Sequence, residues 1–165
     1  MVVMAFVRRH KKKLGVLAAL ILAGPFEDDL DPISNETRSV LKSNKNIFCP
    51  GYLNDVRPAI LSSDVFILPS YREGFPNVVM QACCLERACI VTNINGCNEI
   101  INDMKTGLIV EPKQSEPLYN AMKFLITHPQ ERKEFGKAAR TFVAANYDQS
   151  YLWDLLLNEY KNHLQ

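Results

Sequence analysis

The sequence predicts an α/β fold built on a doubly wound parallel sheet, and three observations lead to this class. Short runs of consecutive apolar residues recur along the chain, longer amphipathic segments separate them, and several runs end at Pro or Gly. Strands that are apolar throughout are buried on both faces, as in parallel sheets covered by helices. The 165 residues are 47% hydrophobic with a net charge of +1. This composition indicates one globular domain and excludes a disordered chain.

The elements follow in order along the chain. We expect a helix over residues 3–13, then a buried strand over residues 16–23 that Gly24 and Pro25 close. The next helix is expected to start with Asp31 as its cap and Pro32 at its first position, and to end near residue 42. The remaining expected strands and helices are, in order, strand 47–49, helix 56–61, strand 65–68, helix 76–86, strand 89–92, helix 98–101, strand 108–110, and helices 115–127, 129–145 and 150–163.

The N-terminal residues allow two other interpretations. Residues 2–7 are apolar enough to form a strand, but only residues 8–13 would then remain for a parallel crossover, which takes about 10–12 residues. We therefore expect the helix, and a sheet that lacks its first strand. The basic residues 8–13 before the apolar residues 14–23 also imitate a signal peptide. Apolar residues precede those charges, however, and a strand-ending turn follows, so we expect a cytoplasmic protein.

Cysteine spacing and net charge exclude several functions. The five cysteines form no CxxC pair and no Cys/His cluster with zinc spacing, so neither a metal centre nor a disulfide framework is expected. We expect buried, reduced thiols at Cys49, Cys83, Cys84, Cys89 and Cys97. The near-zero charge gives no basis for binding nucleic acid, which requires a clustered basic surface.

The loop after the strand at residues 65–68 carries the chemistry. A helix that begins at Pro76 leaves free N–H groups at Asn77, Val78 and Val79, and such a helix end suits a phosphate. Glu73 lies beside this anion site, so we expect it to accept hydrogen bonds from neutral hydroxyls. A sugar joined to a phosphate would satisfy both features. The alternative, that Glu73 only caps the helix, stays open.

Residues 70–79, with the sequence SYREGFPNVV, closely resemble the donor-binding segment of family 4 glycosyltransferases, which are retaining enzymes of the GT-B fold. The resemblance extends over about residues 15–127 with the right spacing, and a series of motifs in one order is far more specific than a single motif. The other matching positions are Gly51-Tyr52, residues 59–69, Ile90-Val91-Thr92, Gly96, Glu99-Ile100-Ile101 and Gly107-Leu108-Ile109-Val110.

This resemblance implies a nucleotide-sugar donor, a UDP- or GDP-sugar, as substrate, with no cofactor and no metal. Glu73 matches the first acidic residue of the family's Glu-x7-Glu signature, which contacts hydroxyls of the transferred sugar and is the implied catalytic residue. The implied donor-binding residues are Gly74, Phe75, Pro76 and Asn77 along the sugar and diphosphate, and Gly51 and Tyr52 close to the base.

Two features depart from the family pattern. The second signature position holds Gln81 instead of Glu, and an amide offers one acceptor oxygen where the family's carboxylate receives both ribose hydroxyls. Gln81 is either a weakened ribose ligand or an ordinary helix-surface residue. The family also draws an Arg and a Lys for the diphosphate from a G-R-x-x-x-x-K-G loop, and nothing in residues 1–20 matches that pattern.

The expected domain is therefore residues 1–165, the Rossmann-like C-terminal half of a GT-B enzyme with its C-terminal helices, truncated at the N-terminus. The implied reaction transfers a sugar, with retention, to a glycan or lipid acceptor held by a missing N-terminal domain, in polysaccharide biosynthesis. Association of the whole enzyme with a membrane surface stays open. The alternative is a catalytically inactive fragment or an interaction subunit. The last helix supports that alternative, because Trp153 and its apolar neighbours form a face that core packing would otherwise bury.

Overall fold

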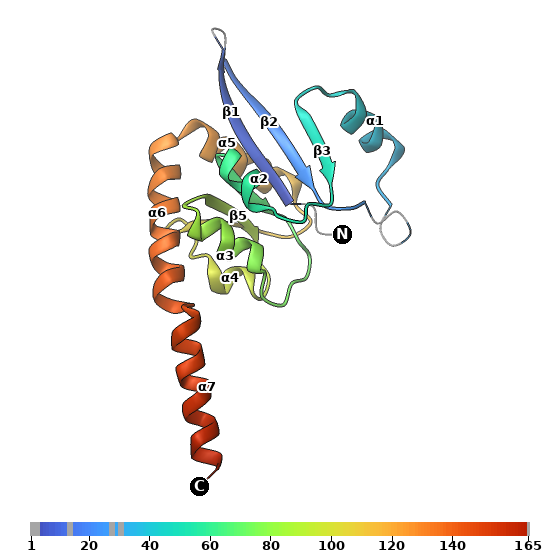
Figure 1. Ribbon diagram of the computed structural model, residues 1–165. Helices are drawn as coiled ribbons and strands as arrows, with labels where there is room; N and C mark the ends of the chain where they lie inside the picture. The colour runs from blue at the N-terminus through green and yellow to red at the C-terminus, as the bar shows by residue number, and fades with distance from the viewer. Residues whose placement is uncertain (1–3, 13–14, 27–28, 30–31, 165) are drawn as a thin grey trace.

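The computed structural model describes residues 4–12, 15–26, 29 and 32–164. They form a six-stranded sheet in the order β3-β2-β1-β4-β5-β6, which is the doubly wound order. Figure 1 shows this sheet with helices on both sides and the C-terminal helix extending away from it. The strands are β1 (Met4–Lys12), β2 (Gly15–Ala23), β3 (Ile47–Gly51), β4 (Val65–Leu68), β5 (Ala88–Thr92) and β6 (Gly107–Val110). The Rossmann-like class expected from the sequence is confirmed.

The central strand of the sheet differs from the expectation. Residues 4–12 form β1, so the helix expected over residues 3–13 is wrong for the part that is described. The place of the first strand is filled, but β1 runs antiparallel to both β2 and β4. An antiparallel neighbour needs only a tight hairpin, and Lys12 pairs with Gly15, so the crossover that excluded a strand here is not required. The sheet is therefore mixed rather than wholly parallel.

The other five strands share one direction, which fixes where their ends lie. β2 pairs parallel with β3, and β4 pairs parallel with β5, which pairs parallel with β6. Since β2 and β4 are both antiparallel to β1, they run the same way as each other. The carboxyl ends of β2 to β6 thus meet at one edge of the sheet, where ligands bind in such folds.

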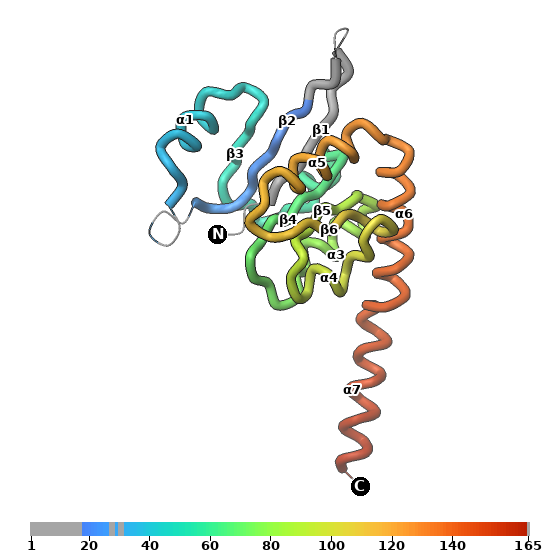
Figure 2. The backbone as a smooth tube through the Cα atoms, turned by 180° about the vertical axis from the view of Figure 1, so that it is seen from behind, coloured from blue at the N-terminus to red at the C-terminus, as the bar shows by residue number. Residues whose placement is uncertain are grey.

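Helices divide the core into two layers. On one face, Phe66 and Leu68 of β4 pack with residues of α2, α3, α4 and α6. On the other face, Val65 and Ile67 pack against α5 and α6, and α5 is seen on the near side in Figure 2. The helices are α1 (Asn35–Ser43), α2 (Arg57–Ser62), α3 (Asn77–Cys84), α4 (Cys97–Ile100), α5 (Ser115–Thr127), α6 (Pro129–Asn146) and α7 (Gln149–His163). From residue 47 onward, these elements confirm the expected ones to within a few residues.

The start of α1 differs from the expected one. The helix begins at Asn35, and the Ser34 hydroxyl accepts a hydrogen bond from the Thr37 N–H at 3.1 Å. Ser34 competes as a cap with the Asp-Pro pair three residues earlier, and the helix forms at the later cap. Pro32 is therefore not helical, and Asp31 lies outside the described residues.

The C-terminal helix α7 contributes nothing to the core. It has no buried residue, and Trp153 keeps 61% of its surface exposed. Figure 1 shows α7 continuing beyond α6 and away from the sheet. The sequence left open whether the apolar face of this helix packs in the core. In the described structure it does not.

The five cysteines form no disulfide. Cys83, Cys89 and Cys97 are buried, and the Sγ atoms of Cys83 and Cys89 lie 3.8 Å apart. Cys49 and Cys84 are exposed, however, so the expectation that all five thiols are buried is wrong for these two. Cys49 lies on β3, which is an edge strand of the sheet, and Cys84 ends α3.

Candidate functional site

The loop after β4 is fixed to the neighbouring strand. The buried Thr92 hydroxyl at the end of β5 donates a hydrogen bond to the Ser70 carbonyl, and the Ser70 hydroxyl donates to the Arg72 carbonyl at 3.2 Å. These bonds hold the first turn of the loop at the carboxyl edge of the sheet. The residues that follow, Glu73 to Pro76, are thereby presented at the place where ligands bind in this class of fold.

The helix end predicted as an anion site is present with one change. Pro76 caps α3 in extended conformation, and the helix begins at Asn77, which is exposed. The Val79 N–H is not free, because it donates to the Pro76 carbonyl at 3.0 Å. Among the described residues, the N–H groups of Asn77 and Val78 have no backbone acceptor. The positive end of the helix dipole faces the loop, so these two groups are suited to an anion.

Glu73 has an unusual environment for a carboxylate. Its side chain is half-buried, and within the described part of the chain its Oε1 atom is buried without a hydrogen-bond partner. It does not act as a helix cap, because the start of α3 has no side-chain cap bond. A buried carboxylate oxygen without a partner is costly to the fold, so it is poised to accept a hydrogen bond from a ligand.

The loop packs against the start of α4. Gly96 has φ +79°, and a Cβ on it would overlap the carbonyl oxygen of Gly74. Glu99 accepts a hydrogen bond from the Gly96 N–H at 3.2 Å and so holds this turn. Burial, together with the negative charge of Glu73, raises the pKa of the neighbouring Cys97 thiol to about 11. Gly96 therefore sets how closely the loop approaches α4.

Phe75 is held by a residue that sequence reasoning missed. Its ring meets the Tyr147 ring edge-on, with centroids 5.2 Å apart, and the Tyr147 hydroxyl donates to the Glu99 carbonyl at 2.9 Å. Burial raises the pKa of Tyr147, and the charge of Glu99 adds to this. Tyr147 ends α6 and is distant from the loop in sequence, so no local pattern could have found it.

Gln81 lies close to part of the predicted site. It is exposed on α3 one turn beyond Asn77, and the two residues line a cavity of about 340 Å³ together with Cys84, Val143 and Tyr147. An amide in such an opening can both donate and accept a hydrogen bond. The position matching the second signature residue is thus accessible from solvent.

Gly51 and Tyr52 lie at the same edge of the sheet but separately from the loop. Gly51 ends β3 with φ +75°, and its carbonyl accepts a hydrogen bond from the Gly24 N–H at 2.9 Å. Tyr52 keeps 74% of its surface exposed. Among the described residues, no backbone hydrogen bond joins this pair to Glu73, Phe75 or Asn77.

Two cations stand at or near the site. Arg72 is exposed within the loop, and the Lys113 ammonium lies over the Tyr71 ring, 5.4 Å from its centroid. The basic residues 8–12 lie on β1, and their side chains fall outside the described part of the structure. Among the described residues, no group of three or more His, Cys, Asp or Glu could hold a metal ion. No described helix is long and apolar enough to span a membrane.

Comparison with known proteins identifies the family. The family profile described as "Glycosyl transferases group 1" matches residues 2–142. The chain belongs to this family, and its fold is that of a C-terminal GT-B domain.

Three relatives illustrate the match. The capsular polysaccharide biosynthesis glycosyltransferase CapM of Staphylococcus aureus is 26% identical over 151 residues, which are 92% of this chain and 40% of CapM. The Alr3699/HepE structure from Anabaena, in complex with UDP, superposes with a TM-score of 0.78 at 16% identity and covers 86% of this chain and 40% of that one. The C-terminal domain of LpcC from Francisella tularensis gives 0.66 at 25% identity, over 75% of this chain and 66% of that one. This chain thus spans less than half the length of CapM.

Proposed function

We propose that this chain is the donor-binding half of a glycosyltransferase that transfers a sugar from a nucleoside-diphosphate sugar to a glycan or lipid acceptor, with retention of the anomeric configuration. The observation that carries the proposal is the buried Glu73 Oε1 atom without a partner, next to the free N–H groups at the start of α3. Family membership supports the reaction class. HepE was crystallised in complex with UDP, and CapM is a glycosyltransferase of capsular polysaccharide biosynthesis.

Different residues would bind the diphosphate, the sugar, the ribose and the base of the donor. The N–H groups of Asn77 and Val78 would bind the diphosphate, with the helix dipole stabilising the charge that develops as it leaves. Glu73 would accept a hydrogen bond from a sugar hydroxyl and so orient the anomeric carbon. Gln81 would contact the ribose, and Gly51 and Tyr52 the base. No protein base and no metal ion is needed in this scheme.

Calorimetric titration of the chain with UDP-hexoses and GDP-hexoses tests the proposal. We expect one series to bind, and we expect Glu73→Gln to weaken that binding by about tenfold, the usual effect of losing a hydrogen bond to a charged group. Glu116→Gln is the matched control, because Glu116 is exposed on α5 and is not one of the proposed donor contacts, so the affinity should not change. A folded chain that binds none of these nucleotide sugars contradicts the proposal.

Gln81→Glu tests the ribose contact separately. A carboxylate at this position can accept hydrogen bonds from two hydroxyls at once, so the variant should bind the same nucleotide sugar more tightly than the unchanged chain. It should give no such gain with a deoxyribose nucleotide. Equal gains with both would show that Gln81 does not face the ribose.

One observation favours a second candidate, an interaction subunit without catalytic activity. The apolar residues of α7 are about half exposed or more along the helix, as Leu152, Trp153 and Tyr160 illustrate. Light scattering coupled to size exclusion separates the two candidates. A monomer that binds a nucleotide sugar supports the first, and a stable oligomer that binds none supports the second.

A further inference from the structure

A second cavity lies at the carboxyl edge of the sheet, at the ends of β4, β5 and β6 where α5 begins. It measures about 490 Å³, within the usual range for small-ligand sites. Tyr71 and Thr92 of its lining belong to segments that match the family, but none of the proposed donor contacts lines it. Its lining includes Tyr71 and Thr92 at the ends of β4 and β5, and Lys113, Gln114 and Ser115 from the segment that leads into α5. Tyr71 is two residues before Glu73, so this cavity and the donor loop are neighbours.

The two charged groups of this cavity, on Glu111 and Lys113, are held in place by contacts within the protein. Glu111 accepts a hydrogen bond from the Asn93 amide at 3.0 Å, and Asn93 in turn accepts one from the Asn98 amide at 3.3 Å. The Lys113 ammonium rests over the Tyr71 ring. Because these two side chains are already ordered, ligand binding would lose little free energy in ordering them.

The lining indicates the chemical class of the ligand. Pro69, Val110 and Leu118 provide an apolar wall, while Glu111, Gln114 and Ser115 provide acceptors and donors at the rim. A sugar ring has the matching surface, with apolar C–H faces and hydroxyls around its edge. The positive charge of Lys113 and the negative charge of Glu111 leave the lining with no net charge, and this favours a neutral ligand over a phosphate.

We propose that this cavity binds a neutral sugar residue of the glycan acceptor beside the donor site. The inference rests on the proposed function, because it places the second substrate of the same reaction. Glu111 receives hydroxyl hydrogen bonds, the Lys113 ammonium and the Gln114 amide donate to hydroxyl oxygens, and the apolar wall packs on the ring.

NMR titration of the ¹⁵N-labelled chain with N-acetylglucosamine, galactose and the disaccharide chitobiose tests the inference. We expect saturable shifts at the amides of Lys113, Gln114 and Ser115 with at least one of these sugars. We expect Glu111→Gln to raise the dissociation constant by about tenfold. Glu116→Gln is a close control, since Glu116 accepts a hydrogen bond from Asn120 much as Glu111 does from Asn93, but lies outside the lining.

The titration with nucleotide sugars separates this inference from the proposed function. Glu111→Gln should leave UDP-hexose or GDP-hexose affinity unchanged, whereas Glu73→Gln should weaken it and leave the sugar shifts in place. Sugar shifts without nucleotide-sugar binding would uphold the cavity and overturn the proposed function. Shifts produced by inorganic phosphate alone, or no cavity shifts with any sugar, would overturn the inference.

Discussion

Gly96 is the residue that joins the donor loop to α4. Its φ of +79° is unfavourable for any residue with a Cβ, and that Cβ would overlap the Gly74 carbonyl. Gly96→Ala should therefore lower the free energy of unfolding by about 2 kcal/mol or more, and should shift the loop that carries Glu73. Thermal or urea unfolding measures the first effect and nucleotide-sugar titration the second.

Gly74→Ala is the matched control for that prediction. A Cβ on Gly74 would meet no atom within 4 Å, and Gly74 does not have a positive φ. The free energy of unfolding of Gly74→Ala should stay close to that of the unchanged chain. If both variants lost the same free energy of unfolding, close packing at Gly96 would not be the cause of its loss.

Cys97 allows a prediction about pH. Its pKa of about 11, raised by burial and by the charge of Glu73, keeps the thiol neutral at physiological pH. Only the thiolate reacts with alkylating reagents, so Cys97 should resist iodoacetamide at neutral pH, and its reactivity should rise as the pH approaches 11. Peptide mapping by mass spectrometry should find the exposed Cys49 and Cys84 modified first. Early labelling of Cys97 in the folded chain would contradict the buried environment described above.

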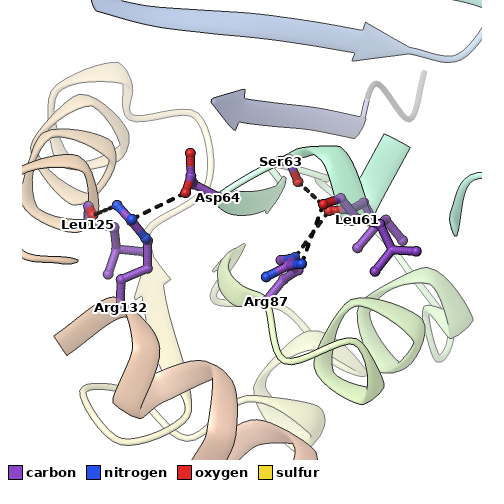
Figure 3. A network of polar contacts seen from close by, with 7 residues as sticks. Leu61, Ser63, Asp64, Arg87, Leu125 and Arg132 are labelled. Carbon is purple, nitrogen blue, oxygen red and sulfur yellow. Dashed lines mark hydrogen bonds and ion pairs between the residues drawn. The ribbon is translucent and has the colours of Figure 1, made fainter. Parts of the chain in front are cut away.

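At the scale of elements, an arginine joins α5, α6 and the start of β4. Figure 3 shows Arg132 between the Leu125 carbonyl and Asp64, with Arg87 on the Leu61 carbonyl nearby. The Arg132 guanidinium donates to Leu125 at 2.9 Å and to Asp64 at 3.2 Å, and its side chain is only 12% exposed. This network lies at the opposite edge of the sheet from the candidate site, so its role is to hold the helices on the sheet.

Arg132→Met should therefore destabilise the fold and spare the site. The loss of two charge-assisted hydrogen bonds in a half-buried position should lower the free energy of unfolding by about 2–3 kcal/mol. Urea unfolding measures this, and nucleotide-sugar affinity should not change in the folded variant. Arg57→Met is the comparison, because the Arg57–Asp55 pair is exposed and should contribute little. If Arg132→Met lowered the free energy of unfolding as little as Arg57→Met does, Arg132 would not hold the helices on the sheet.

At the scale of the whole molecule, α7 stands apart from the α/β body. None of its residues is buried, and an isolated helix of about 15 residues is only marginally stable in water. Removing residues 149–165 should therefore leave the melting temperature of the body nearly unchanged. Calorimetry measures this, and a clear fall in melting temperature would show that α7 packs on the body.

Trp153 reports on α7 without any truncation. It is the single tryptophan of the chain, and its 61% exposure predicts red-shifted emission that iodide quenches readily. A blue-shifted, protected signal would mean that the apolar face is covered in solution. The same signal then follows the binding of any partner to this helix.

The sequence by itself determined the strands from residue 47 onward, the helices that cover them and the loop that carries Glu73. These follow from local causes, namely apolar runs and helix-start residues such as Pro129 in the first turn of α6, which act within a few residues. It also placed Gln81 and Asn77 on neighbouring turns of one helix. The departure of Gln81 from the family pattern was visible for the same reason.

Only the tertiary structure decided the direction of β1 and the neighbours of the loop. The direction of β1 depends on pairing with β4, which is far away in the chain. The contact of Tyr147 with Phe75, and that of Gly96 with Gly74, join segments that no local pattern relates. Local propensity acts over a few residues, whereas strand order and side-chain contacts depend on the packing of the whole chain.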